Sequence, residues 1–401
     1  MRWNRWLVMF GAAILLLALV ACGGSTAEEE VSDATEADSG AESESASDSE
    51  SDAVSETEAG DGCDSLTPVT LQLQWVAQSQ FAGYYAAQDQ GFYEDECLEI
   101  TIREGAVEIV PQQVVAAGDA EFGIAWVPKM LASREQGADL VNIGQVFQRS
   151  GTMQIAWADS GIETVEDWAG KRVGTWGFGN EWEVFAALRQ AGIDPDAPDQ
   201  VTIVQQPFDM SLLLNREIDL AQAEVYNEYA QLLEATNPET GELYQPEDFT
   251  VFDYNDVGTA MLQDHIFVRE EWLAESGNEE IAERFLEASF RGWIWCRDNF
   301  DACVEIVLDN GTTLGEGHMR WQLNEVNALI WPSPQGIGVL DQDLYEQTVD
   351  ISLDFGVLEN PPDDAAARTD LAEAALSEMG DLDTTGEGFE KRDVEVTPGG
   401  E

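Results

Sequence analysis

The sequence predicts an α/β protein with two lobes, each built on a largely parallel sheet covered by helices. Short apolar runs of strand type alternate with segments of helical spacing, a pattern typical of parallel sheets whose strands are connected by helices. The alternation begins near residue 69 and restarts near residue 160, which indicates a second lobe. After residue 270 the pattern becomes helical, so the chain is predicted to finish in helices.

The first lobe begins with VTLQLQW, in which Val69, Leu71, Leu73 and Trp75 alternate on one face as in a half-buried strand. The segment that follows has helical spacing and a stop signal at a glycine. The rest of the lobe is predicted as a helix ending near residue 91, a strand in LEITIRE, and two helix–strand units over 109–126 and 127–147.

The second lobe repeats this plan, and the chain should then return to the first lobe. Its predicted strands are centred on KRVGTW, QVTIVQQ, DLAQAE and DFTVFDY, with helices between them. The expected crossings between lobes lie near residues 150–158 and 255–265, and the helices after residue 270 should pack on the first lobe. The predicted divisions are 63–155 and 261–358 for the first lobe and 156–260 for the second.

The N-terminus has the form of an export signal over residues 1–22. Two arginines precede an apolar run that is shorter than a comfortable membrane span of roughly 20 residues. The run ends in LVAC, which resembles the lipobox of bacterial lipoproteins and implies that Cys22 becomes the lipidated first residue of the mature protein. The alternative is an uncleaved anchor helix. Either way we expect an extracytoplasmic protein held at the cell membrane.

Strongly acidic segments flank the folded part. Residues 23–62 contain no aromatic residue, Lys or Arg, so they are predicted to form a disordered tether. The tail, residues 359–401, is predicted to be mostly disordered too, although part of it could form a helix. With 79 acidic and 18 basic residues, the chain lacks the clustered cations that nucleic-acid binding requires. A saline habitat is one explanation for this charge.

Four cysteines remain once Cys22 is assigned to the lipid, and an even number in an exported chain suggests disulfides. Three connectivities are possible, and local closure favours Cys63–Cys97 and Cys296–Cys303. A metal site is not expected, because the chain has no Cys-x-x-Cys and its two histidines, His265 and His318, stand alone in the sequence.

Three long stretches carry a family resemblance. LQWVAQSQFAGYYAAQDQGFYEDECLEITI, GDAEFGIAW and DWAGKRVGTWGFGNEWEVFAALRQAGID resemble extracytoplasmic binding proteins that serve ABC transporters of thiamine pyrimidine precursors, aliphatic sulfonates and related ligands. The likeness runs from about Val69 to Phe355. It implies a type II periplasmic-binding-protein fold with a hinge and a central ligand cleft. Within this family the sequence is most similar to those of bacterial riboflavin-uptake lipoproteins.

The glycine-rich turn GTWGFGNE favours a flat ligand over a phosphate. A phosphate-binding loop would end in G-K-[ST], whereas this turn ends in Asn180 and Glu181, and a carboxylate there would repel phosphate. Glycines such as Gly177 let the backbone approach a ring. Ligands of two-lobed α/β proteins lie beyond the carboxyl ends of the strands. Three tryptophans fall at such predicted ends, although each could instead be core: Trp75, Trp126 and Trp176.

Polar partners should orient the ring, and amides suit the imide edge of a flavin or the amine of a pyrimidine. Carboxylates favour a ligand that bears hydrogen-bond donors, such as ribityl hydroxyls or an aminopyrimidine. Of Tyr84 and Tyr85, one should face the cleft and the other the core. The alternative for each polar candidate is a solvated rim residue. The polar candidates are Gln78, Gln80, Gln148, Asn180, Glu181, Asp209, Glu224, Tyr226 and Asn227.

These features predict the substrate-binding component of an ABC importer, with a planar heteroaromatic vitamin as ligand. Riboflavin comes first, and a thiamine pyrimidine precursor of the hydroxymethylpyrimidine or formylaminopyrimidine type is the alternative. An enzyme related to pyrimidine synthases is disfavoured, because their expected cysteine-rich motif is missing, and Glu181 with His265 has no supporting spacing. A third hypothesis is an adhesive surface lipoprotein that binds no small ligand. We expect a monomer that needs no cofactor and delivers its ligand to a permease.

Overall fold

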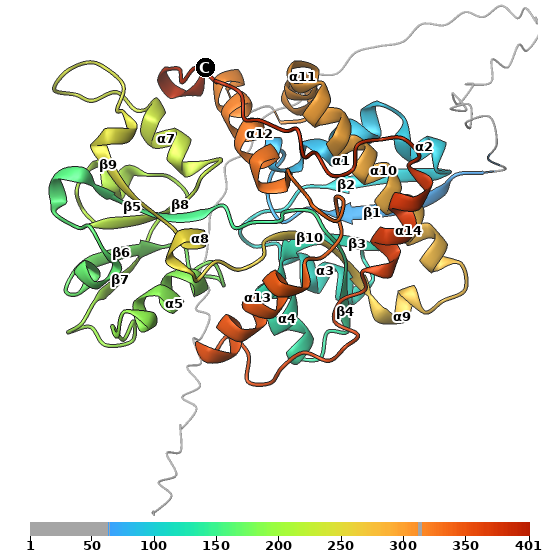
Figure 1. The fold of residues 1–401 in the computed structure, drawn as a ribbon, viewed down its shortest axis with the longest axis horizontal. Coiled ribbons are helices and arrows are strands. Elements are labelled where there is room, and N and C mark those ends of the chain that lie inside the picture. The colour runs from blue at the N-terminus through green and yellow to red at the C-terminus, as the bar shows by residue number, and fades with distance from the viewer. Residues whose placement is uncertain (1–62, 64, 312–314) are drawn as a thin grey trace, which may run out of the picture. The chain divides into compact units, whose positions relative to one another are not determined.

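The computed structural model describes residues 63, 65–311 and 315–401, and these residues contain two five-stranded sheets (Figure 1). The predicted signal peptide (1–22), its Cys22 and the predicted tether (23–62) lie outside the described residues. No helix of the described part is both long enough and apolar enough to cross a membrane.

The first sheet has the strand order β2-β1-β3-β10-β4. β1 pairs in parallel with β2 and β3, and β10 is antiparallel to both β3 and β4. The strands and helices of this lobe up to the first crossing are β1 (Thr67–Gln72), α1 (Ala82–Asp89), α2 (Phe92–Asp95), β2 (Leu98–Arg103), α3 (Pro111–Ala117), β3 (Phe122–Trp126), α4 (Val127–Glu135) and β4 (Leu140–Gln145).

The second sheet has the order β7-β6-β8-β5-β9, and its strands appear in green to yellow in Figure 1. β6 is parallel to β7 and β8, and β5 is antiparallel to β8 and β9. Its elements are β5 (Thr152–Trp157), β6 (Arg172–Thr175), α5 (Trp182–Gln190), β7 (Thr202–Gln205), α6 (Ser211–Leu214), β8 (Leu220–Glu224), α7 (Glu228–Glu234), β9 (Phe249–Asp253) and α8 (Tyr254–Val257).

Each sheet is mixed, because the strand by which the chain enters it from the other lobe runs antiparallel to its neighbours. These entry strands are β5 and β10, and the crossings that lead to them span residues 146–151 and 258–263. β5 belongs to the second sheet, so the predicted boundary at residue 156 is wrong by several residues. All six residues of β5 are buried, so no alternation marked it as the start of a new lobe.

The return to the first lobe brings one strand and six helices. They are β10 (Asp264–Arg269), α9 (Glu270–Leu273), α10 (Asn278–Asp298), α11 (Phe300–Asn310), α12 (Glu316–Ile330), α13 (Gln342–Asp354) and α14 (Asp370–Glu378).

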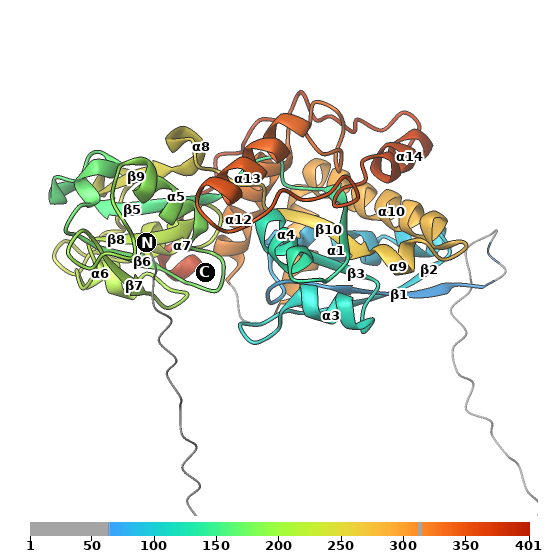
Figure 2. The ribbon, with the colours of Figure 1, turned by 90° about the horizontal axis from the view of Figure 1, so that it is seen from below.

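Helices α1 and α10 cross very closely against the first sheet, as Figures 1 and 2 show from two directions. Gly83 makes this approach possible, because a Cβ there would lie 2.2 Å from the ring of Trp293. Gly292 does the same from α10, where a Cβ would lie 2.0 Å from the carbonyl oxygen of Gly83. Trp293 is therefore part of the core, and so is Trp331.

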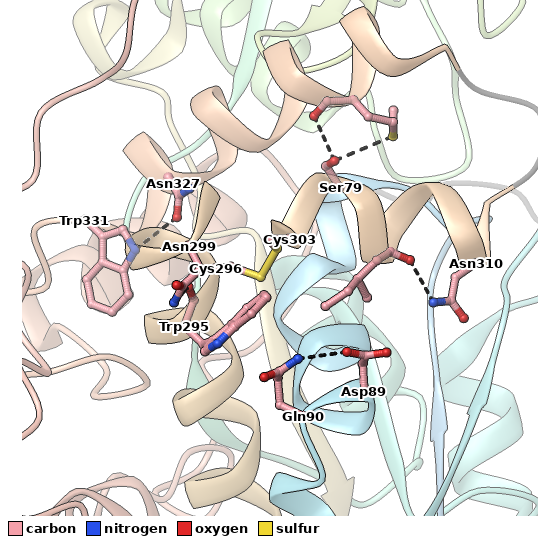
Figure 3. Close-up of a disulfide and its surroundings, with 12 residues drawn as sticks. Ser79, Asp89, Gln90, Trp295, Cys296, Asn299, Cys303, Asn310, Asn327 and Trp331 are labelled. Carbon is pink, nitrogen blue, oxygen red and sulfur yellow. Dashed lines mark hydrogen bonds between the residues drawn. A yellow bond between two sulfur atoms is a disulfide. The ribbon is translucent and has the colours of Figure 1, made fainter. Parts of the chain in front are cut away.

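Two disulfides join the same cysteine pairs that local closure favours. Cys63 is bonded to Cys97, with 5.6 Å between their Cα atoms, and Cys296 is bonded to Cys303, with 5.1 Å. Figure 3 shows the second bond between α10 and α11, where Asn299 ends one helix and precedes the next. Its amide donates a hydrogen bond to the carbonyl oxygen of Trp295 (3.0 Å).

The prediction of a mostly disordered tail is wrong for residues 359–401. α14 buries Leu371 and Ala375 in the core of the first lobe. Segment 389–401 then runs from one lobe to the other, since Val394 packs on the first-lobe core and Val396 on the core of the second. The prediction was based on the acidic composition of residues 359–401. It overlooked that their few apolar residues are spaced so that they can pack against the lobes.

Candidate functional site

A cavity of about 170 Å³ lies between the strand ends of the two sheets. Aromatic and polar side chains from both lobes line it. The aromatic residues are Trp75, Trp126, Trp176, Phe178, Phe208 and Tyr226, and the polar ones are Gln74, Gln78, Gln80, Gln112, Lys129, Asn180, Glu224, Asn227 and Glu228. Ala106, Val107, Ile109, Val110 and Pro111 add an aliphatic part.

Three tryptophans reach this cavity because each follows the carboxyl end of a parallel strand. Trp126 is the last residue of β3, Trp176 comes directly after β6, and Trp75 lies three residues beyond β1. Strands that run in parallel end at the same edge of their sheet, which is where α/β proteins of this kind bind ligands. The topology therefore brings together three rings that are far apart in the sequence.

Trp176 is buried, yet it is not part of a core. It is 3% exposed, but it belongs to none of the hydrophobic clusters formed by the described residues. Its indole N–H meets no acceptor in the described part of the chain. Buried polar atoms nearly always have a partner, so an unpaired donor at a cavity wall is suited to an acceptor on a ligand.

Phe208 completes the aromatic wall and joins the two lobes. It lies in the turn after β7, with its ring centroid 6.1 Å from that of Trp176 at an interplanar angle of 13°. Across the cavity, its centroid is 4.8 Å from that of Trp75. Offset aromatic pairs at these separations are favourable, so a flat ligand would meet rings from both lobes.

Glu224 is the main buried acid of the second lobe. It ends β8 and pairs across the sheet with Thr152, whose Oγ1 donates a hydrogen bond to its carboxylate (2.9 Å). Gln263 Nε2 is a second donor at 3.3 Å. Burial raises the pKa of Glu224 well above its usual range, and repulsion from Glu228 adds to this.

Glu228 lies beside it at the start of α7. Its carboxylate accepts hydrogen bonds from the backbone N–H of Glu224 (3.0 Å) and from Asn227 Nδ2 (2.8 Å). Burial raises the pKa of Glu228 to about 7, against the lowering effect of these bonds. Near neutral pH both the protonated and the ionised form of Glu228 are therefore accessible, so its carboxyl group can either donate a hydrogen bond to a ligand or accept one.

Asp264 supplies a third buried acid, directly behind the cavity wall. It begins β10 and pairs with Trp126 at the end of β3, because the two strands are antiparallel. It accepts hydrogen bonds from Gln74 (2.5 Å) and Gln80 (2.8 Å), two amides that line the cavity. Burial raises the pKa of Asp264 to about 7. Asp264 thereby fixes the orientation of both amides.

Lys129 is the only lysine or arginine that lines the cavity in the described chain. It lies one turn into α4, with its Nζ 4.5 Å from the ring centre of Trp126. The Nζ donates a hydrogen bond to Asn180 Oδ1 in the other lobe (2.7 Å). Burial lowers the pKa of Lys129 to about 8, while nearby carboxylates, with Glu181 first, oppose the change.

Of the fourteen ligand-binding residues predicted from the sequence, the structure brings nine together around the cavity. They are Trp75, Gln78, Gln80, Trp126, Trp176, Asn180, Glu224, Tyr226 and Asn227.

The other five lie outside the cavity lining. Tyr84 is buried in the core, where its ring meets that of Trp293 edge-on at 5.7 Å. Gln148 lies in the first crossing and donates its amide to backbone carbonyl groups. Gly177 turns the backbone at φ 73°. Glu181 accepts a hydrogen bond from the N–H of Gly179, and Asp209 is exposed and accepts one from the N–H of Ser211.

Several cavity residues were missed by the sequence analysis, namely Gln74, Lys129, Phe178, Phe208, Glu228 and the lining residues of segment 106–112. Lys129 could have been found, since it follows Trp126 by one helical turn on the helix that leaves the cleft. Asp264 has a weaker signal, because it begins its strand whereas the search considered strand ends.

His265, one of the two residues of the enzyme alternative, does not line the cavity. His265 is fully buried in β10 next to Phe267, outside the cavity, and burial lowers its pKa to about 4. No group of three or more His, Cys, Asp or Glu residues in the described chain is arranged to hold a metal ion.

Comparison with known proteins identifies a family and a fold. The NMT1/THI5 like family matches residues 78–302. Among solved structures, the periplasmic sulfonate-binding protein SsuA from Methylobacillus flagellatus superposes with a TM-score of 0.57 at 15% identity, covering 80% of this chain and 97% of its own. This likeness agrees with the two-lobed, type II fold that the sequence predicts.

Relatives of the chain include two binding proteins and a pyrimidine phosphate synthase. The riboflavin-binding protein RibY of Chloroflexus aurantiacus is 24% identical over 75% of this chain and 84% of its own length. The formylaminopyrimidine-binding protein of Halalkalibacterium halodurans is 21% identical over 62% of this chain and 72% of its own. A 4-amino-5-hydroxymethyl-2-methylpyrimidine phosphate synthase of Legionella pneumophila is 31% identical, but the match spans 34% of this chain and only 43% of the synthase.

Proposed function

Because the chain belongs to the NMT1/THI5 like family, we propose that it is the substrate-binding component of an ABC importer and captures a planar heteroaromatic compound. The observation that carries this proposal is the meeting of Trp75, Trp126 and Trp176 at one cavity. Rings provide a large contact area at a small cost in conformational entropy, which suits a flat ligand. Closure of the lobes about the crossings at 146–151 and 258–263 would enclose it.

Riboflavin is the first candidate. Its ring would stack on Trp176 and Phe208, and a ring carbonyl oxygen could accept the indole N–H of Trp176 that lacks a partner. The ribityl hydroxyls would donate to Glu224 and Glu228. The match to RibY supports this candidate, because it covers more of the chain than the matches to the other two relatives.

An aminopyrimidine is the second candidate, and two observations favour it. The cavity of about 170 Å³ is smaller than the roughly 300 Å³ at the lower end for drug-sized ligands. Buried carboxyl groups such as Glu224 and Glu228 also suit the amino group and ring nitrogen of such a pyrimidine.

Titration of riboflavin, followed by its fluorescence, tests the first candidate. We expect quenching at micromolar concentrations, and purified protein that carries bound flavin should be yellow. Calorimetry with 4-amino-5-hydroxymethyl-2-methylpyrimidine tests the second. If neither compound binds and neither raises the melting temperature, the importer role for flat heteroaromatic ligands is refuted, since a ligand that binds the folded state must stabilise it.

We also propose that lipid on Cys22 anchors the mature protein outside the membrane, where it works as a monomer beside its permease. Membrane fractionation of cells that express the wild type or Cys22→Ala tests the anchor. The wild type should sediment with membranes, and equal distribution of the two proteins would exclude a lipid at this cysteine.

A further inference from the structure

We propose that the cavity binds the unphosphorylated form of its ring ligand and discriminates against the phosphate ester of the same ring. This inference rests on the proposed function, and it specifies the chemical form of the cargo. Three features of the described residues support it: a single cation that is already engaged, an excess of buried acids, and a glycine-rich turn whose own carboxylate occupies the place of an anion.

The cavity offers a phosphate one cation, which already contacts two side chains. Lys129 donates to Asn180 Oδ1 at 2.7 Å and lies over the ring of Trp126. Phosphate recognition usually combines several charged donors, often the bidentate fork of arginine. No arginine is found among the residues that line the cavity. A bound phosphate would therefore share Lys129 with Asn180 and would lack a second cation.

The buried acids around this cation oppose a second anion. Glu224 and Glu228 line the cavity, and Asp264 lies behind Gln74 and Gln80. Burial already raises the pKa of all three acids, because the site solvates negative charge poorly. A phosphate would bring up to two negative charges into the same surroundings, and each of these acids that is ionised would repel it. A neutral ring that offers donors adds no charge.

The turn before α5 is the other place where an anion could bind, because helix N-termini offer free N–H groups. Here the N–H of Gly179 donates to the carboxylate of Glu181 (2.9 Å). The N–H of Asn180 donates to the carbonyl oxygen of Gly177 (3.1 Å), and the N–H of Trp176 to Gln222 Oε1 (3.3 Å). These three N–H groups are therefore already engaged, and the carboxylate of Glu181 places a negative charge at the start of α5 that repels an incoming anion.

The test compares riboflavin with riboflavin 5′-phosphate, and 4-amino-5-hydroxymethyl-2-methylpyrimidine with its phosphate, by fluorescence titration and calorimetry respectively. For the ring that binds, we expect the phosphate ester to bind at least tenfold more weakly. Glu181→Gln should narrow the ratio of the two dissociation constants at least threefold, because it removes the carboxylate that blocks the turn. The ratio is insensitive to a general loss of binding that affects both ligands equally.

Asp256→Asn is the matched control. Asp256 is an exposed acid of the same lobe, in α8, and its substitution removes the same charge away from the cavity lining. In Asp256→Asn, the ratio of the dissociation constants of the phosphate ester and the unphosphorylated ring should equal that of the wild type. Equal affinity for a ring and its phosphate would overturn the inference while supporting the proposed function. Binding of neither ring would overturn both. A ratio that stays unchanged in Glu181→Gln would refute the role of the turn.

Discussion

Replacing Trp176 by alanine separates a ligand-binding ring from a core ring. If the ring stacks on the ligand, the substitution should remove about 1 to 3 kcal/mol of binding free energy, by analogy with base–aromatic stacking. This corresponds to a dissociation constant raised about 5- to 150-fold. Fluorescence titration with riboflavin measures it directly.

The structure also determines what the same change should do to the unliganded protein. Trp176 is buried, so its removal has some effect on stability, but the ring packs in none of the described hydrophobic clusters. We therefore expect the free energy of unfolding to fall by about 1 kcal/mol, well below the roughly 3 to 5 kcal/mol of a core tryptophan. Trp168→Ala is the matched control, since Trp168 is fully buried in a core cluster of the same lobe.

Chemical denaturation of both variants without ligand, together with titration, decides the question. The reasoning predicts a large loss of affinity with a small loss of stability for Trp176→Ala, and a loss of stability of about 3 to 5 kcal/mol for Trp168→Ala. Equal losses of stability in the two variants, with ligand affinity unchanged in Trp176→Ala, would show that Trp176 is an ordinary core residue.

Three further predictions concern the free energy of unfolding of the protein without ligand. Burial raises the pKa of Glu228 to about 7, above its value in the unfolded chain, so the protonated carboxyl stabilises the folded state fully below about pH 4 and this stabilisation is lost as the pH rises towards 7. Glu228→Gln should therefore make the fall of the free energy of unfolding with pH shallower, as measured by denaturation curves between pH 4 and 8. Gly83→Ala should cost about 1 to 3 kcal/mol or more, because its Cβ would overlap a tryptophan ring, whereas Gly388→Ala meets no atom within 4 Å and should be nearly neutral. Replacing both cysteines of Cys296–Cys303 by serine should cost about 2 to 3 kcal/mol, the chain-entropy value for so short a loop, and an unchanged midpoint in urea would contradict this.

The sequence was sufficient to predict the three tryptophans of the cavity, because apolar runs mark where parallel strands end, but it did not predict Phe178 or Phe208. Trp126 and Trp176 were found in this way. The same rule could not find Asp264, which lies behind the cavity wall at the first residue of an antiparallel strand and holds Gln74 and Gln80. Whether a strand runs parallel or antiparallel depends on pairing between distant segments, and no local pattern records it.

Composition misled the analysis at the end of the chain. Residues 359–401 are rich in acids, yet Leu371, Ala375 and Met379 recur every four residues and dock as one face of a helix and its end. Burial of a few well-spaced apolar groups against a preformed surface outweighed the repulsion expected from the average charge. Tyr84 and Gln148 were predicted to bind the ligand but do not line the cavity. The reason is related, because contacts with residues far away in the sequence decide how these side chains are oriented.

Segment 389–401 offers a position at which a dye could report a change in the separation of the two lobes. It contacts the cores of both lobes within three residues, through Val394 and Val396. Any change in the separation of the lobes must therefore alter its surroundings. Glu395 lies exposed between these two anchors, and every cysteine after residue 62 is held in a disulfide. A cysteine introduced at position 395 and labelled with an environment-sensitive dye would convert ligand capture into an optical signal, without a label in the cavity itself.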